Sequence, residues 1–105
     1  MQYYRIDVYV PGTHADAVKS AMFAAGAGRL GNYDSCCFQI CGTGQFRPLD
    51  GANPYLGSAG QVEQVTEWKL EMVCPEDCLR AVITALRGAH PYETPAYQYW
   101  AVSLE

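Results

Sequence analysis

Three cysteines near the middle of the chain carry the side chains best suited to binding a soft metal ion. Cys36, Cys37 and Cys41 offer thiolates, and His90 offers an imidazole further along the chain. These ligand types suit a divalent metal such as Zn(II), or Cu(I). On an extended strand, however, Cys37 and Cys41 face one side and Cys36 faces the other, so only two can converge. The alternative is that they are structural thiols, buried as small apolar side chains.

Two further cysteines, Cys74 and Cys78, have a CxxxC spacing at a predicted helix start. This spacing without further ligands is a weak indication of a metal site. The amino terminus, MQYYRIDVYV, has no basic region followed by an apolar run, so we do not interpret it as a signal peptide. We therefore expect a cytoplasmic protein whose five cysteines remain free thiols.

The run His90-Pro91-Tyr92-Glu93 places a histidine close to a carboxylate. Such a pair performs acid-base chemistry in some enzymes and binds metals in others. Proline at positions 91 and 95 restricts the backbone, so a rigid connector that bonds across a subunit interface is an equally good interpretation. The sequence contains no paired carboxylates, nucleophile-base motif or phosphate loop. We therefore predict that the protein is not an enzyme, with catalysis by His90 and Glu93 as an alternative.

Several glycines would allow a backbone amide to approach a ligand closely: Gly28, Gly31, Gly42 and Gly44. The run GAGRLG resembles a dinucleotide-binding fingerprint, but it follows a predicted helix where the fingerprint requires a strand. A Rossmann fold is therefore rejected. Tight turns are the alternative role for these glycines.

A long glycine-rich segment, residues 42–60, lies between two predicted strands. Loops of this length without secondary structure are usually either functional or disordered. Phe46, Tyr55 and Leu56 favour an ordered loop, because a solvated linker rarely carries large apolar side chains. We expect it to contact a ligand or a partner protein, or to pack on a neighbouring subunit.

The composition is that of one folded domain covering residues 1–105. A net charge of -4 and scattered basic residues argue against nucleic-acid binding, which requires a basic surface. No apolar run approaches the ~20 residues that a membrane-spanning helix needs.

Hydrophobic periodicity predicts strand, helix, strand, strand, helix, strand. Apolar and polar residues alternate in the strands expected at residues 3–10, 33–41, 62–73 and 97–104. This order is typical of the ferredoxin-like βαββαβ fold, an α+β arrangement in which two helices cover one face of a four-stranded antiparallel sheet. The loop at residues 42–60 then lies at the tip of the central hairpin.

Helix boundaries are predicted from capping residues. Thr13 and Asp16 resemble a capping box at the first helix, and Gly26 follows its end. Pro75 is expected at the first position of the second helix and Gly88 at its end.

The face of the sheet without helices is predicted to be a subunit interface, because it combines aromatic residues with charges of both signs. Its expected members are Tyr3, Arg5, Tyr9, Lys69 and Glu71, together with Tyr97 and Tyr99.

Nearly the whole chain resembles a known domain. The matching runs are GAGRLGNY at residues 26–33, CCF at 36–38, GTGQFRP at 42–48, GANP at 51–54 and the closing HPYE. They resemble the YqfO-type, PII-like insert of the Nif-three-like proteins, here expected as a stand-alone protein. HPYE and the strand order are also similar to the CutA divalent-cation-tolerance proteins.

The resemblance implies a homotrimer with its sheets facing inward, but it supplies no activity. The metal-binding catalytic half of the larger relatives has no counterpart here, and two histidines, His14 and His90, are too few for its dinuclear site. The interpretation is a regulatory or sensor module that binds a small ligand or metal at intersubunit clefts and a partner protein through residues 42–60. The alternative is a CutA-like protein of metal tolerance. The candidate ligand-binding residues are Gly28, Gly31, Asn32, Tyr33, Gly42, Gly44, Phe46, His90, Tyr92 and Glu93.

Overall fold

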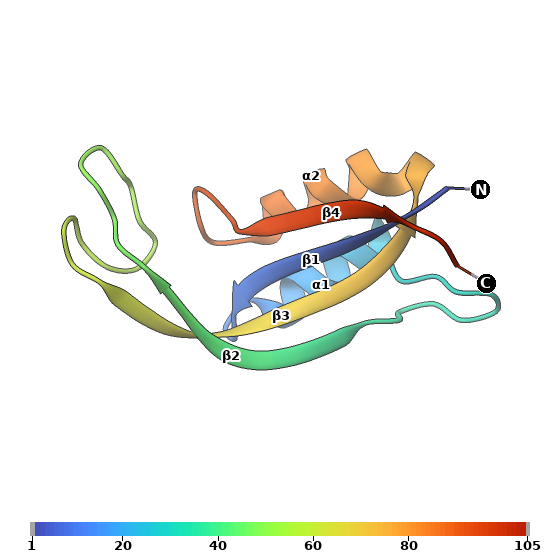
Figure 1. Ribbon diagram of the computed structural model, residues 1–105, viewed down its shortest axis with the longest axis horizontal. Helices are drawn as coiled ribbons and strands as arrows, with labels where there is room; N and C mark the ends of the chain where they lie inside the picture. Colours follow the sequence, from blue (N-terminus) through green and yellow to red (C-terminus); the bar gives the residue numbers. More distant parts are fainter. Residues whose placement is uncertain (1, 105) are drawn as a thin grey trace.

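The computed structural model describes residues 2–104 and has the predicted α+β, ferredoxin-like fold (Figure 1). Its elements are β1 (Tyr3–Pro11), α1 (Ala15–Ala24), β2 (Phe38–Phe46), β3 (Glu63–Pro75), a 3-10 turn η1 (Glu76–Cys78), α2 (Leu79–Ala89) and β4 (Tyr97–Val102). The four strands pair antiparallel in the order β2-β3-β1-β4. Neither helix is long and apolar enough to cross a membrane.

One hydrophobic core lies between the sheet and the two helices. Ile6, Val8 and Val10 of β1 are fully buried and face the same side as Leu70 and Met72 of β3. Burying side chains of this size contributes roughly 1.5–3 kcal/mol each before entropy is counted. The helices complete the core with Val18, Met22, Val82, Ile83 and Leu86.

The second strand lies closer to the tip of the central hairpin than predicted. β2 runs over Phe38–Phe46 and not over residues 33–41, and its Thr43 lies opposite Thr66 of β3. The glycines at 42 and 44 are therefore strand residues, and the loop at the hairpin tip covers residues 47–62 and not 42–60. Pairing with the 13-residue β3 outweighs the weak strand preference of glycine.

Three helix boundaries differ from their predictions. The N-cap of α1 is His14 without a side-chain cap bond, because the Thr13 hydroxyl bonds to His14 Nδ1 at 2.9 Å. Pro75 ends β3 and caps the 3-10 turn, so α2 begins only at Leu79. Gly88 lies inside α2, which ends at Ala89. The glycine after α1 is as expected, since Gly26 has a φ of 117°.

On the helix-free face, Trp100 takes the place predicted for Tyr97 and Tyr99. Residues paired across antiparallel strands share a face, and Trp100 pairs with Arg5 whereas Tyr97 pairs with Val8. Tyr99 therefore lies on the helix side, where its ring stands edge-on to Tyr4. The face predicted for Tyr97 and Tyr99 is therefore wrong: in β4 these tyrosines face the helices, and the residues next to them face the other way.

Four charged residues form a network at the centre of the helix-free face. Arg5 bonds to Asp7 at 2.9 Å and to Glu71 at 2.7 Å. Lys69 lies 3.5 Å from Asp7 and 3.0 Å from Glu71. The carboxylates stabilise the lysine ammonium and raise the pKa of Lys69, chiefly through the bond to Glu71. Two cations thus neutralise two carboxylates, of which Asp7 is 2% exposed.

Candidate functional site

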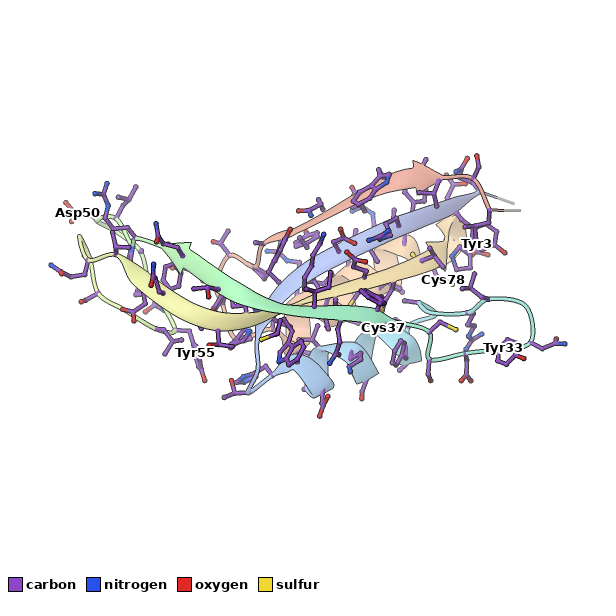
Figure 2. All side chains as sticks on the ribbon, turned by 60° about the horizontal axis from the view of Figure 1, so that its bottom comes forward. Tyr3, Tyr33, Cys37, Asp50, Tyr55 and Cys78 are labelled. Atoms are coloured by element: carbon purple, nitrogen blue, oxygen red, sulfur yellow. The ribbon has the colours of Figure 1, made fainter. Side chains whose placement is uncertain are left out.

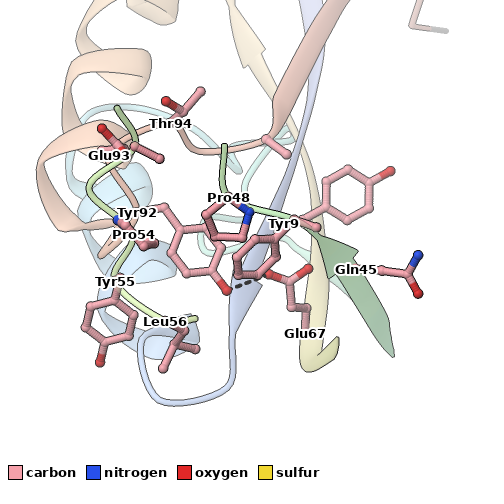
Figure 3. A pocket seen from close by; sticks show the side chains of 13 residues that line it. Tyr9, Gln45, Pro48, Pro54, Tyr55, Leu56, Glu67, Tyr92, Glu93 and Thr94 are labelled. Carbon is pink, nitrogen blue, oxygen red and sulfur yellow. Dashed lines mark hydrogen bonds between the residues drawn. The ribbon is translucent and has the colours of Figure 1, made fainter. Parts of the chain in front are cut away.

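A pocket of about 290 Å³ lies between the hairpin loop and the connector that joins α2 to β4 (Figure 3). The connector begins with the HPYE run. Aromatic rings, prolines and two carboxylates line the pocket. Its lining residues are Tyr9, Gln45, Phe46, Pro48, Ala52, Pro54, Tyr55, Leu56, Glu67, Tyr92, Glu93, Thr94 and Ala96.

Tyr92 stands at the centre of this pocket. Its hydroxyl donates a hydrogen bond of 2.9 Å to Glu67 Oε2, drawn as a dashed line in Figure 3. Burial, the bond to Glu67 and the charge of that carboxylate raise the pKa of Tyr92, so the phenol stays protonated as a donor. The Glu67 carboxylate lies directly over Gly44, where an added Cβ would overlap it. Gly44 therefore makes room for a side chain of the protein itself.

His90 forms the base of the connector, and both of its ring nitrogens are occupied. Nε2 lies 2.7 Å from the carbonyl oxygen of Tyr9, and the backbone N–H of Tyr92 donates to Nδ1 at 3.2 Å. This pattern requires the neutral tautomer with hydrogen on Nε2. Burial lowers the pKa of His90, which also favours the neutral ring. In this arrangement no ring nitrogen of His90 is free for proton transfer or metal binding.

The loop is attached to the connector and to itself. The backbone N–H of Asn53 donates to Glu93 Oε2 at 2.6 Å, and Gly60 N–H donates to the Pro48 carbonyl at 2.8 Å. The Tyr55 ring lies 6.2 Å from the Tyr92 ring, centre to centre. A small number of contacts thus defines the shape of the pocket.

The predicted metal ligands are not brought together. Cys36 and Cys37 line a second hollow, of about 300 Å³, at the other end of the sheet, whereas His90 lies beneath the loop pocket. Within residues 2–104, no three histidine, cysteine or acidic side chains are grouped closely enough to hold a metal ion. The expected separation of Cys36 and Cys37 onto opposite faces is wrong, because β2 begins only at Phe38. Cys41 is an exposed strand residue.

The buried Cys74 and the half-buried Cys37 and Cys78 are disfavoured as thiolates. Burial raises the pKa of Cys74 to about 11 and also raises the pKa values of Cys37 and Cys78. Thiolates are the reactive and metal-binding form of cysteine. Cys74 belongs to the hydrophobic core, and Cys78 packs against Gly26, where any side chain would collide with it.

The candidate ligand residues divide between the two ends of the molecule. Phe46, Tyr92 and Glu93 line the loop pocket. Gly28, Gly31, Asn32 and Tyr33 belong to the segment before β2, and Figure 2 shows Tyr33 and Tyr55 at opposite ends. The glycines of that segment serve its turns: Gly28 has a φ of 78° and Gly31 a φ of 55°. Gly42 is a strand residue with open space beside it.

Sequence reasoning missed Tyr9, Glu67 and the prolines of the pocket. A tyrosine between two prolines, as at position 92, needs an acceptor for its hydroxyl when it is buried. The sequence could therefore have predicted a hydrogen-bond acceptor for the Tyr92 hydroxyl, but it does not indicate that this acceptor is Glu67 and not another acidic residue.

Comparison with known proteins gives relatives in sequence and in fold. No family model matches the chain. It is 47% identical over 95 residues to a "GTP cyclohydrolase 1 type 2 homolog" of Mycobacterium leprae and 44% identical over 98 residues to one of Bacillus subtilis. These matches cover 90% and 93% of this chain but only 25% and 26% of those proteins. The chain therefore spans about a quarter of the length of the curated relatives it matches.

Solved structures also include a relative that is much longer than this chain, and in addition they show a likeness to the CutA proteins. A Bacillus cereus protein related to NIF3 superposes with a TM-score of 0.84 at 40% identity, covering 98% of this chain and 26% of that one. CutA of Xylella fastidiosa superposes with a TM-score of 0.69 at 19% identity, covering 100% of this chain and 88% of that one. At 19% identity the second likeness shows the fold alone. The chain is thus a homologue of the NIF3-related proteins over about a quarter of their length, with the fold of the CutA proteins.

Proposed function

We propose that this chain is a non-enzymatic regulatory or sensor module that binds a small molecule in the loop pocket. The observation that carries the proposal is the position of the pocket, between a loop of residues 47–62 and a connector stiffened by Pro91 and Pro95. Ligand sites are typically concave and mainly apolar, with a few polar groups that orient the ligand. Glu67, Tyr92 and Glu93 are such groups here.

Binding would be transmitted through the loop. The loop is attached to the connector by one backbone hydrogen bond to Glu93 and by the packing of Tyr55 on Tyr92, beside which Phe46 of β2 also lies. A ligand that adds contacts to both walls stabilises one loop conformation, and a partner protein that recognises this loop would then bind differently.

Self-association is part of the proposal. The helix-free face exposes Phe38 to 64% and leaves Ile40 and Trp100 exposed beside the charged network. Exposed apolar side chains of this kind are typical of subunit contacts. We infer a homotrimer in which these faces meet, so that the pocket lies close to a neighbouring subunit.

The names of the relatives suggest two other functions. The cyclohydrolase label belongs to proteins of which the match covers only 25%. The engagement of both His90 nitrogens argues against acid-base catalysis by His90 and Glu93. A CutA-like metal function takes its support from the fold and from the position of Cys36 and Cys37 in one hollow. This metal function has less support than ligand binding in the loop pocket, because burial raises the pKa of Cys37 and so disfavours its thiolate.

A fragment screen followed by amide NMR tests the proposal. We expect binders to shift resonances of residues 47–62 and 90–96 together, and to protect the loop from protease. Tyr92→Ala removes the central ring and should abolish these shifts, whereas Tyr33→Ala, at the far end of the molecule, should retain them. Binders that cluster elsewhere, or shifts that survive in Tyr92→Ala, would show that the pocket is not the ligand site.

A further inference from the structure

The charge of the loop pocket is unbalanced. Among its described lining residues there are two carboxylates, Glu67 and Glu93, and no lysine, arginine or histidine. Each carboxylate accepts a hydrogen bond from a neutral donor, the Tyr92 hydroxyl and the Asn53 N–H. Within residues 2–104 neither carboxylate forms an ion pair with a lysine, arginine or histidine. The negative charge of the pocket is therefore available to a ligand.

Aromatic rings surround these carboxylates. The centre of the Tyr92 ring lies 5.9 Å from that of Phe46 and 6.2 Å from that of Tyr55, and Tyr9 also lines the cavity. The face of an aromatic ring carries negative electrostatic potential and attracts a cation within about 6 Å of its centre. Rings and carboxylates thus favour the same sign of charge in a ligand.

The remaining walls are apolar. Pro54 and Leu56 contribute accessible aliphatic surface, beside the buried Pro48. A small hydrated metal ion would leave this surface unused. A cation with an apolar or aromatic body would cover it and gain the free energy of removing it from water.

From these features we propose that the pocket takes a small organic cation, a primary amine or guanidinium attached to an apolar or aromatic group. The charged end lies beside Glu67, with Glu93 adding to the negative charge of the pocket, and the apolar body packs against the tyrosine rings and the prolines. This inference rests on the proposed function, since it names the ligand class of the same pocket. The cavity of about 290 Å³ limits the ligand to a compact molecule.

Three probes of matched shape test the sign of the charge: phenethylamine as the cation, 2-phenylethanol as the neutral analogue and phenylacetate as the anion. Each is titrated into the full chain, with amide NMR as the readout. Phenethylamine should shift residues 47–62 and 90–96 and bind about tenfold more tightly than the alcohol, and phenylacetate should not bind.

Three glutamate-to-glutamine variants test whether binding depends on the charges in the pocket or only on the net charge of the protein. Glu67→Gln keeps an oxygen that accepts the Tyr92 hydrogen bond but removes the charge, and it should weaken phenethylamine binding about tenfold. Glu93→Gln should weaken it as well. Glu63→Gln, on the same strand but outside the pocket lining, is the matched control and should bind as the wild type does. The spectra of the unliganded variants establish that the loop is retained.

The two proposals fail in different ways. If 2-phenylethanol or phenylacetate binds as tightly as phenethylamine in the same place, the ligand site stands and the assignment to a cation is overturned. The same holds if Glu67→Gln and Glu93→Gln both bind phenethylamine normally. If none of the three probes shifts the pocket, the cation assignment is again overturned, and the fragment screen judges the pocket independently.

Discussion

Two pairs of carboxylates in this molecule differ in how their charge is balanced. Asp7 and Glu71 lie at the centre of the sheet, and both are paired with Arg5 and Lys69. Glu67 and Glu93 line the pocket at the end of the hairpin and accept bonds only from neutral donors in the described chain.

The difference separates a structural cluster from a candidate binding site. A buried carboxylate needs a paired cation and hydrogen bonds to compensate for lost hydration, and Asp7 has both. The pocket carboxylates are less buried: Glu67 is half-buried and Glu93 is exposed, so they do not need a paired cation in the same way. A protein that already places cations beside one acidic pair leaves the other pair free for a ligand.

The largest effect is expected from removing a cation of the central cluster. Arg5→Gln leaves Asp7 and Glu71 to share Lys69 and should lower the free energy of unfolding by about 2 kcal/mol, a value reduced for the partial exposure of the arginine. Arg80→Gln, on the exposed side of α2, is the control and should change it by less than about 0.5 kcal/mol. Urea denaturation measures both. A loss in Arg5→Gln no larger than in Arg80→Gln would mean that the central pair tolerates unbalanced charge as the pocket pair does.

A smaller and more local effect is expected in the pocket. Gly44→Ala places a methyl group where the Glu67 carboxylate lies, so the bond to Tyr92 must break or the strand must shift. We expect a loss of about 1–2 kcal/mol and faster amide exchange in residues 47–62. Gly42→Ala, two residues earlier with open space beside it, should be neutral or slightly stabilising. Equal behaviour of the two variants would contradict the position assigned to Glu67.

The sequence allowed the fold to be predicted because strand alternation in β1 and β3 is unambiguous. It failed where tertiary pairing overrides local preference: Gly42 and Gly44 read as loop residues but pair in a strand, and the alternation in β4 was set one residue out of step. Phe46, Tyr92 and Glu93 of the pocket were among the candidates. Tyr9 and Glu67 were not, because nothing in their local pattern indicates that the hairpin loop folds back over them.

His90 should make the stability of the protein depend on pH. Because burial lowers the pKa of His90 below its ordinary value of 6.5, the unfolded chain binds a proton more readily than the folded chain in the window just below pH 6.5. The contribution of His90 to stability is therefore complete above pH 6.5 and is lost as the pH falls through that window. Denaturation midpoints at pH 5.5 and 7.5 measure this effect, which His90→Gln should reduce. Identical pH dependence in the wild type and in His90→Gln would show that His90 protonates equally in both states.

The smallest effect is expected at the cysteine hollow, which contains Glu71 of the balanced pair. Because Arg5 and Lys69 already neutralise that carboxylate, the hollow offers a cation little net negative charge, and burial raises the pKa of Cys37. We therefore expect Cys36→Ser/Cys37→Ser to leave the uptake of zinc or, under anaerobic conditions, Cu(I) unchanged in native mass spectrometry. The same spectra report the oligomeric state, so a metal lost through dissociation of subunits is distinguished from a metal lost with its ligands. The opposite result is a fixed number of metal ions bound by the wild type and none by the double variant. It would make the cysteine hollow a metal site, and the balance of charges would then be a poor guide to where this protein binds cations.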